Sequence, residues 1–359
     1  HYILPKARHE LLVKILEQKK HRLDEMMKQR LNYELQLIEK MEFSGLFLIA
    51  NEIGNFCREK NITINVRGSA NSSFVLYLFG LSVTNPLRFN LPFERFLNEA
   101  RSEPPDIDID VEFHRRDEVM GFLFERYGHQ NTAQISTMSH FRQHSSFRDV
   151  CLAFGISPSE LRKIDLHLNE DLIKRIRNYA ARLASLPNHV SVHIGGVVIT
   201  PTRIDEFVPL CQSDKTTITH FDKDGIDYIG LVKLDILGVR GFPTIANLIQ
   251  SPPDEKGEIY DLISQGKTLG CFQIESPPMR SLLVKLKPKK IEDIAFALAL
   301  IRPGATSSGM KGEYLKRSEK GELVEYFPGS LFPLLKDTGG VPVYQEQILE
   351  IANVFAGFS

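Results

Sequence analysis

The stretch PPDIDIDVEF, residues 104–113, carries an acidic side chain at every second position, on Asp106, Asp108, Asp110 and Glu112. Such strict alternation predicts a β-strand, because successive strand side chains point to opposite faces of a sheet. The four carboxylates then share one face, and the apolar side chains between them point into a core. Neighbouring carboxylates on that face lie about 6–7 Å apart, so their repulsion makes the face costly unless a cation binds there.

Metal binding is the function that we favour for this acidic strand. Hard oxygen ligands at this spacing suit Mg²⁺, and two such ions about 3.5–4 Å apart suit phosphoryl transfer. The alternative is a solvent-facing edge strand whose charges prevent aggregation. Four acids within seven residues exceed what that protection requires.

A third carboxylate from another strand would complete such a site. The stretch VKLDIL, residues 232–237, offers Asp235 between two apolar neighbours. Burying a lone acid without a partner costs several kcal/mol, so its presence in an apolar strand indicates a function. An ion pair with Lys233 is the alternative, which we discount on the ground that neighbouring strand residues point to opposite faces.

Composition places the chain among ordinary globular proteins. Its 359 residues are 42% hydrophobic and 25% charged, which excludes wholesale disorder and indicates about two or three domains. Four separated cysteines without a CxxC pair disfavour a disulfide framework or zinc knuckle and favour a reducing cytoplasm. No stretch resembles a membrane span, and the first residues do not resemble a signal peptide.

The charge is unevenly distributed along the chain. The net charge of −1 does not indicate a nucleic-acid partner by itself. Residues 1–30, however, carry eight basic against four acidic side chains, and residues 280–320 carry ten against four. These basic stretches could bind phosphates while the acidic strand binds metal, although each could equally be a solvated helix face.

The hydrophobic pattern predicts helices and strands in alternation. Helices are expected at residues 6–42, 44–60, 74–81 and 291–301, and mostly helical segments at 115–185, with a cap at Ser157–Glu160, and beyond 241. Strands are expected at residues 61–66, 106–113, 193–200 and 227–237. The small-residue loop 67–73 lies between a strand and a helix, where free backbone N–H groups bind anions readily.

Longer motifs resemble a known family. RGSANSS (67–73), NPLRFNLPFERFLN (85–98) and PPDIDIDVEFHRRDEVM (104–120) resemble the palm of bacterial C-family DNA polymerases, the alpha subunit of DNA polymerase III. The resemblance continues in order through AQISTMSHFRQHSSFRDV (133–150), HIGGVVITPTRIDEFVPL (193–210), FDKDGIDYIGLVKLDILGV (221–239), GCFQIESPPMRSLLVKLKPKKIEDIAFALALIRPG (270–304) and VPVYQEQILEIA (341–352). It therefore covers most of the chain.

The resemblance implies an α+β fold. Its centre would be a polymerase-beta-like nucleotidyltransferase palm with a mixed sheet, joined to a helical thumb and mostly helical fingers. By motif position we expect a helical lead-in at residues 1–45, palm at 46–116 and 189–240, thumb at 117–188 and partial fingers at 241–359.

The resemblance also assigns catalytic and metal-binding roles, to Asp108, Asp110 and Asp235. These three aspartates would hold two Mg²⁺ ions while a primer 3′-hydroxyl attacks the α-phosphate of a deoxynucleoside triphosphate. Asp106 and Glu112 would be outer neighbours.

Nucleotide-binding residues follow from other motifs. Gly68 and Ser69 match the family's Gly-Ser element, which contacts the incoming triphosphate, and Arg67 precedes them as in the family. The residues before that Arg are Asn65-Val66, where the family usually has Pro-Gly. Lys233, Arg302 and His193 also match nucleotide-site positions, with an ordinary surface charge or a structural histidine as the alternative. DNA or phosphate contacts are expected from Arg142, His144, Arg148, Gln273, Lys285 and Lys287.

The expected function is a template-directed DNA polymerase core acting on primer-template DNA in the bacterial cytoplasm, at the nucleoid. HVSVHIGG (189–196) and LALIRPGATSSGM (298–310) favour the error-prone, translesion branch over the replicative one. The family's N-terminal phosphoesterase domain and C-terminal regions, including those that bind the sliding clamp, have no counterpart among these motifs, so we expect a fragment or reduced relative. The alternative is a truncated module that binds DNA or a partner without catalysis.

Overall fold

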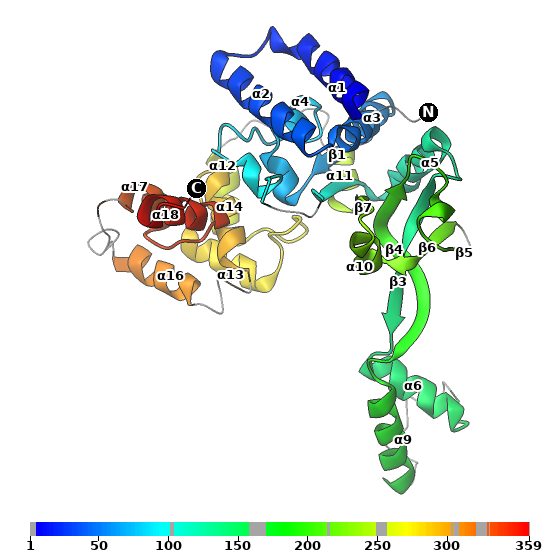
Figure 1. The fold of residues 1–359 in the computed structure, drawn as a ribbon. Helices are drawn as coiled ribbons and strands as arrows, with labels where there is room; N and C mark the ends of the chain where they lie inside the picture. Colours follow the sequence, from blue (N-terminus) through cyan, green and yellow to red (C-terminus); the bar gives the residue numbers. More distant parts are fainter. Residues whose placement is uncertain are drawn as a thin grey trace. The chain divides into compact units, whose positions relative to one another are not determined.

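The computed structural model describes residues 5–100, 104–157, 170–213, 216–248, 257–302, 304, 309–320, 329 and 331–358. The chain divides into two compact units, His1–Val239 and Arg240–Ser359 (Figure 1). The division falls at the end of the strand that carries Asp235, so all three aspartates with predicted catalytic roles belong to the first unit.

A seven-stranded sheet of order β1-β2-β7-β4-β3-β6-β5 forms the centre of the first unit. Its strands are β1 (Ile64–Val66), β2 (Ile107–Glu112), β3 (Thr132–His140), β4 (Pro187–Ile199), β5 (Leu210–Gln212), β6 (Thr217–Asp222) and β7 (Lys233–Val239). The pairs β2–β7 and β3–β6 are parallel, and the other neighbours are antiparallel. This mixed sheet with its many helices confirms the expected α+β class.

One hydrophobic core joins the acidic strand to five helices, which are α1 (Pro5–Lys20), α2 (Glu25–Lys40), α3 (Ser44–Glu59), α4 (Phe74–Leu78) and α5 (Arg116–Tyr127). The apolar side chains of β2 alternate as predicted, with Ile107, Ile109 and Val111 fully buried. Burying each side chain of this kind contributes about 1.5–3 kcal/mol, so the core fixes which face of β2 the aspartates occupy. Leu12 and Leu16 of α1 lie in the same core, so the N-terminal helices pack with the sheet.

The single helix predicted at residues 6–42 is wrong, because two helices occupy this range. The chain leaves the helical path at His21 and Arg22, and α2 begins after Asp24. The Asp24 carboxylate accepts a hydrogen bond from the Met27 amide at 2.8 Å. Aspartate at this position satisfies an N–H group that the first turn leaves without a partner, which makes it a start signal that apolar periodicity does not reveal.

The mostly helical segment predicted at residues 115–185 is also wrong in part. Strand β3 interrupts it at residues 132–140 and pairs with β4 and β6 in the sheet. Helix α5 packs on the main core, so the helical insertion begins at residue 143 instead of at the expected boundary of 117. Of the cap predicted at Ser157–Glu160, residues 158–160 lie outside the described residues.

The strand predicted at residues 227–237 begins later than expected. Residues Lys223–Tyr228 form helix α10, and the Asp222 carboxylate caps it by accepting from the Gly225 amide at 3.1 Å. Only Lys233–Val239 pairs as strand β7. The strand at 193–200 is confirmed within the longer β4.

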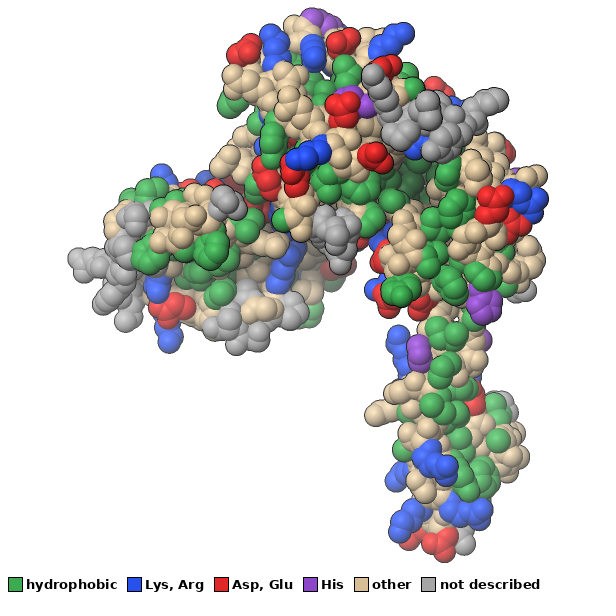
Figure 2. Space-filling view, viewed as in Figure 1, with side chains coloured by type: hydrophobic (Ala, Val, Ile, Leu, Met, Phe, Trp, Pro, Cys, Tyr) green, Lys and Arg blue, Asp and Glu red, His purple; other side chains and the backbone are tan. Residues whose placement is uncertain are grey.

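A pair of helices is inserted at the end of the β3–β4 ribbon (Figure 1). These helices are α6 (Gln143–Ala153) and α9 (Glu170–Leu183), and they share a small core that includes Val150 and Ile176. Figure 2 shows Lys and Arg side chains at the surface of this pair, which on α9 include Lys174, Arg175, Arg177 and Arg182. The helix pair therefore carries a basic surface, and its role as the thumb stays a prediction of the family resemblance.

The described residues of the second unit form helices joined by turns and loops, without a strand among them. Its helices are α11 (Gly241–Leu248), α12 (Gly257–Ser264), α13 (Pro277–Leu286), α14 (Ile291–Leu300), α16 (Met310–Lys320), α17 (Phe332–Leu335) and α18 (Gln345–Ala356). A core around Leu283, Ala297 and Leu300 joins several of them. In the part of the chain that the structure describes, no helix has both the length and the apolarity needed to cross a membrane.

The shared core predicts a marked difference between two adjacent leucines of α1. Leu12 is fully buried and Leu11 is 41% exposed. Leu12→Ala should lower the free energy of unfolding of the first unit by about 2–5 kcal/mol, because it removes buried methyl groups and leaves a cavity. Leu11→Ala, the matched control, should change it little. Denaturant unfolding followed by circular dichroism measures both, and equal effects would show that α1 does not share the core of the sheet.

Candidate active site

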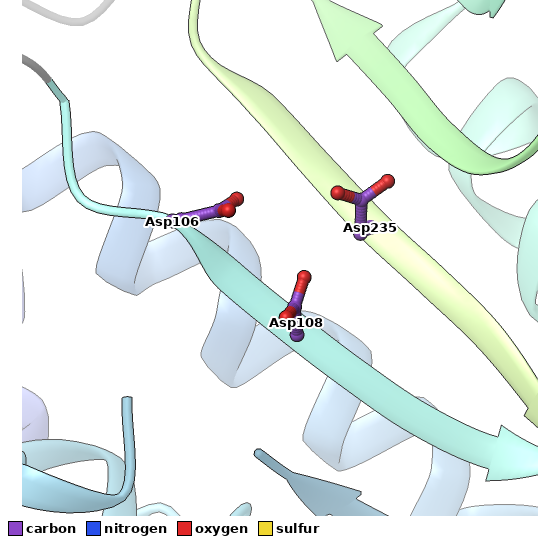
Figure 3. A group of neighbouring side chains, drawn as sticks. All are labelled: Asp106, Asp108 and Asp235. Atoms are coloured by element: carbon purple, nitrogen blue, oxygen red, sulfur yellow. The ribbon is translucent and has the colours of Figure 1, made fainter. Parts of the chain in front are cut away.

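Two aspartates lie side by side on adjacent parallel strands. The register of β2 and β7 places Asp108 opposite Asp235. Because residues paired in this way point to the same face of a sheet, the two carboxylates meet. Asp106, which precedes β2, joins them, and one carboxylate oxygen from each of the three aspartates lies within 4.8 Å of the others (Figure 3). Asp106 is exposed, Asp108 is half-buried and Asp235 is buried.

A lysine side chain neutralises part of this negative charge. The Lys233 Nζ donates to Asp106 Oδ1 at 2.6 Å and to Asp235 Oδ2 at 2.7 Å. Our sequence argument against a pair between Lys233 and Asp235 was therefore wrong, since residues two apart on a strand share a face. Burial lowers the pKa of Lys233, but the hydrogen bonds and charges of the two aspartates outweigh it and raise the pKa overall.

The environment favours the protonated form of Asp108. Its pKa is raised by burial first and then by the negative charges of Asp106 and Asp235. A bound cation would remove this repulsion, because it would supply the positive charge that the carboxylates lack. The arrangement is therefore suited to hold a cation.

One oxygen of the cluster has no hydrogen-bond partner among the described residues. Asp235 Oδ1 is buried, and His193 Nδ1 lies 3.6 Å from it. That nitrogen accepts hydrogen bonds from the Gly196 amide at 2.7 Å and from the Gly195 amide at 3.3 Å. Because Nδ1 accepts these bonds, it has no proton to donate to Asp235. The buried carboxylate oxygen is thus left for another partner.

The close approach of β4 to this carboxylate requires glycine. A Cβ atom on Gly195 would lie 2.5 Å from Leu237 Cδ2 and 3.3 Å from Asp235 Oδ1. A side chain at this position would therefore displace the end of the Leu237 side chain and crowd the Asp235 carboxylate. The HIGG motif is explained by this packing and by the bonds to His193.

Asp110, the remaining aspartate with a predicted catalytic role, forms an ion pair with Arg67. Arg67 Nη2 lies 2.5 Å and Nε 2.8 Å from Asp110 Oδ1. Burial raises the pKa of Asp110, and the charge and hydrogen bond of Arg67 oppose that shift. The structure thus brings Asp108 and Asp235 together with Asp106, which the resemblance places as an outer neighbour. Asp110 is instead paired with Arg67, a residue with a predicted nucleotide-binding role.

The Gly-Ser loop begins beside the same strand. The Arg67 amide donates to the Asp108 carbonyl at 3.1 Å, and Gly68 follows with a φ of +65°. This left-handed conformation favours glycine and turns the chain into a short 3₁₀ helix, Gly68–Ser72. Gly68 and Ser69 are therefore adjacent in the chain to a residue that contacts the backbone of Asp108.

The other predicted contact residues lie elsewhere in the two units. Arg142, His144 and Arg148 are exposed on or beside α6 of the insertion, where Arg148 pairs with Asp149 at 2.8 Å. Four others belong to the second unit, where all are exposed: Gln273, Lys285, Lys287 and Arg302. The aspartate cluster includes none of these seven residues.

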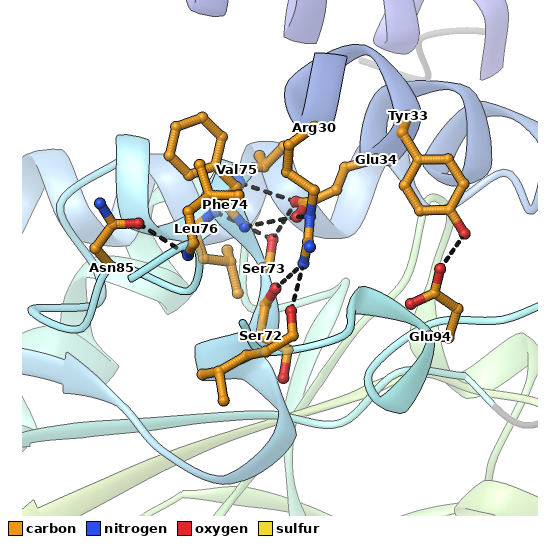
Figure 4. A network of polar contacts seen from close by, with 12 residues as sticks. Arg30, Tyr33, Glu34, Ser72, Ser73, Phe74, Val75, Leu76, Asn85 and Glu94 are labelled. Carbon is orange, nitrogen blue, oxygen red and sulfur yellow. Dashed lines mark hydrogen bonds and ion pairs between the residues drawn. The ribbon is translucent and has the colours of Figure 1, made fainter. Parts of the chain in front are cut away.

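Sequence reasoning missed a buried ion pair that contacts the Gly-Ser loop. Arg30 and Glu34 lie one turn apart on α2 and bond to residues 72–75 (Figure 4). The i, i+4 spacing of an arginine and a glutamate was the available signal, but this spacing is as typical of solvent-exposed pairs as of buried ones.

Two family models match the chain and together cover almost all of it. "Bacterial DNA polymerase III alpha NTPase domain" matches residues 4–238, and "Bacterial DNA polymerase III alpha subunit finger domain" matches residues 244–359. The chain belongs to the bacterial DNA polymerase III alpha family. The resemblance seen in the sequence motifs is thereby confirmed.

Curated relatives in this family include error-prone DNA polymerases. The chain is 34% identical over 382 residues to the one from Bradyrhizobium sp. (strain ORS 278), covering 94% of this chain and 33% of the relative. It is 34% identical over 345 residues to the one from Corynebacterium glutamicum, covering 92% and 33%. It is also 34% identical over 363 residues to the one from Pseudomonas fluorescens (strain Pf0-1), covering 91% and 35%. The chain spans about a third of the length of these relatives.

The raised pKa of Asp108 gives a test of the crowded carboxylates that needs no activity. The pKa of Asp108 in the folded state exceeds the ordinary value of 3.8. The free energy of unfolding therefore falls as the pH rises through the folded-state pKa, because the carboxyl then ionises in an environment that disfavours its charge. Asp108→Asn should therefore raise the unfolding temperature at neutral pH and lose this advantage below pH 3.8, where the parent carboxyl is protonated in both states. The control Asp224→Asn removes an 80% exposed carboxylate and should show no such gain. Lower stability of Asp108→Asn at neutral pH would contradict this account.

Proposed function

We propose that this chain is the catalytic palm, thumb and part of the fingers of a template-directed DNA polymerase. It would add deoxynucleotides to a primer 3′ end, in replication or in error-prone translesion synthesis. The observation that carries the proposal is the in-register pair of Asp108 and Asp235, with a buried carboxylate oxygen that has no hydrogen-bond partner among the described residues. The similarity to error-prone DNA polymerases favours the error-prone role for this family member.

The residues present fit a hard divalent cation such as Mg²⁺. The donors are carboxylate oxygens, and the unpartnered Asp235 Oδ1 is buried, where a charged atom is stable only with a counter-charge. We propose that Asp108, Asp110 and Asp235 hold two such ions, and that Arg67 releases Asp110 to allow it. When bound, the ions would lower the pKa of the primer 3′-hydroxyl and neutralise charge on the triphosphate.

The chain's own cations would orient the nucleotide. Arg67 begins the Gly-Ser loop and, once away from Asp110, offers a planar fork for phosphate oxygens. Gly68 and Ser69 would offer backbone N–H groups without a side chain in the way. Lys233 neutralises part of the charge of Asp106 and Asp235 and would contact the triphosphate from the same face, as would His193, which lies beside Asp235. Arg302 would be a further triphosphate ligand from the fingers.

Primer-template DNA would bind through basic side chains that are not part of the aspartate cluster. Arg142, His144 and Arg148 are exposed at the insertion, and the exposed cations of α9 extend this surface (Figure 2). Lys285 and Lys287 would contact phosphates from the fingers, with Gln273 as a further contact. Such contacts supply sequence-independent affinity that falls as salt rises.

The proposal predicts that two substitutions separate chemistry from DNA binding. Asp235→Asn and Asp108→Asn should reduce nucleotide incorporation by about 10³-fold or more, because the amide cannot supply the negative charge that a hard cation requires. Affinity for primer-template should stay within about twofold, since it depends on distant Lys and Arg side chains. Single-nucleotide primer extension and fluorescence anisotropy measure the two effects.

The control for these variants is Asp224→Asn, whose side chain is 80% exposed on α10. It should leave incorporation unchanged. Incorporation by Asp235→Asn at the parent rate would show that the catalytic assignment is wrong. Loss of DNA affinity together with activity, in both variants, would favour the alternative of a binding module without catalysis.

Direct metal binding gives a second test that is independent of incorporation. Millimolar Mg²⁺ should raise the unfolding temperature of the parent, because a ligand that binds only the folded state stabilises it. The rise should disappear in Asp235→Asn and persist in Asp224→Asn. Differential scanning fluorimetry measures it, and an equal rise in all three proteins would exclude the aspartate cluster as the metal site.

A further inference from the structure

A buried ion pair in the N-terminal helices contacts the segment that ends the Gly-Ser loop. Glu34 is fully buried, and Arg30 Nε donates to its Oε1 at 2.7 Å (Figure 4). The two residues lie on the same face of α2, four positions apart. The chemistry described for the active site does not use either residue, so the presence of a buried charged pair here needs its own explanation.

The Glu34 carboxylate determines where helix α4 begins. It accepts hydrogen bonds from the Phe74 amide at 2.8 Å, the Val75 amide at 3.0 Å and the Ser73 hydroxyl at 3.0 Å. The first N–H groups of a helix have no partner within it, so a side chain from outside must satisfy them when they are buried. Burial raises the pKa of Glu34, and the Phe74 and Val75 amides, together with Arg30, oppose the shift. The carboxylate thus holds the residues that directly follow the loop.

The Arg30 guanidinium extends this attachment into the loop itself. Its Nη2 donates to the Ser72 carbonyl at 2.8 Å and to the Leu91 carbonyl at 2.9 Å. Ser72 is the last residue of the Gly68–Ser72 turn. A planar guanidinium can serve the carboxylate and both carbonyls at once, which a lysine ammonium cannot do with the same geometry.

The opposite end of the loop is attached to the strand of the aspartates. The Arg67 amide bonds to the Asp108 carbonyl, and Val66 pairs with Ile109. Only the four residues Gly68–Asn71 lie between Arg67 and Ser72, the two points of attachment. A displacement of Ser72 or Ser73 is therefore transmitted to Gly68 and Ser69 over a short, turned segment.

We propose that Arg30 and Glu34 are positioning residues, which hold the Gly68–Ser72 loop in the conformation that receives the triphosphate. The inference rests on the proposed function of that loop, and neither side chain touches the nucleotide. A buried ion pair is by itself weak evidence for stability, because apolar residues of similar volume often replace one without loss. Here, however, the ion pair bonds to three backbone groups where the loop ends and α4 begins: the Ser72 carbonyl and the Phe74 and Val75 amides. These bonds fix the backbone at the end of the loop, and this is why we assign the pair a positioning role.

Glu34→Gln tests the proposal with little change of shape. The amide retains one oxygen but presents an NH₂ group where the second oxygen accepted, so the bond from the Val75 amide is lost and the Ser73 hydroxyl can no longer donate. The KM for the deoxynucleoside triphosphate should rise about tenfold, while kcat and primer-template affinity change less than about twofold, as for lost substrate positioning in the ground state. Arg30→Lys should change KM in the same direction.

The matched control is Glu52→Gln, which makes the same substitution in a different arginine pair. Glu52 accepts from Arg126 at 2.8 and 2.9 Å and from the Tyr127 hydroxyl at 2.7 Å, between α3 and α5. None of these bonds involves the Gly68–Ser72 loop. Glu52→Gln should lower the unfolding temperature and leave the KM for the deoxynucleoside triphosphate unchanged.

Amide hydrogen exchange gives a readout that needs no incorporation. In Glu34→Gln, and in the milder Ser73→Ala should Glu34→Gln fail to fold, amides 68–75 should exchange faster while those of β7 keep the parent rate. Unchanged exchange in the loop would overturn the proposal. Equal acceleration in the loop and in β7, or a nucleotide KM that rises as much in Glu52→Gln, would show a general stabilising role and also overturn it. A different result tests the proposed polymerase function: that function would be wrong if Asp235→Asn incorporated nucleotide at the parent rate.

Discussion

The parallel pairing of β2 with β7 is the constraint on which the rest of the site depends. It sets Asp108 and Asp235 side by side on one face of a sheet, where partial burial strengthens their repulsion. Neighbouring residues reduce this repulsion or make room for the carboxylates. Lys233 neutralises part of it through Asp106 and Asp235, and Gly195 gives the carboxylate room beneath β4. A buried oxygen of Asp235 still lacks a partner among the described residues, and a cation is the chemical species that would satisfy it.

The hydrophobic core connects this electrostatic arrangement to segments far away in the chain. The apolar face of β2 packs in the same core as helices α1 to α5. Through that core, α2 is placed so that Arg30 and Glu34 reach the end of the Gly-Ser loop. The loop is thereby attached at one end to the aspartate strand and at the other to the N-terminal helices. This makes the N-terminal helices part of the site's support.

Much of the fold and part of the site could be predicted from the sequence. Alternation identified β2 correctly, because its apolar residues are fully buried and its acids are not. The same reasoning missed β3, whose first five residues are all buried in mid-sheet and therefore show no alternation. It also joined α1 to α2, since apolar periodicity continues across the break that Asp24 creates. The separate thumb and fingers boundaries remain predictions of the family resemblance, except that β3 and α5 belong with the sheet.

The sequence by itself determined the acidic strand, its polar face, the glycine that begins the loop and the family, because these depend on local periodicity, backbone conformation and continuous motifs. Only the tertiary structure decided which carboxylates meet. Asp108 and Asp235 are separated by more than a hundred residues, and their register is set by the packing of the strands that carry them. For the same reason Arg67 binds Asp110, Lys233 binds Asp106, and Glu34 caps α4: each is a contact between distant segments, which no local pattern encodes.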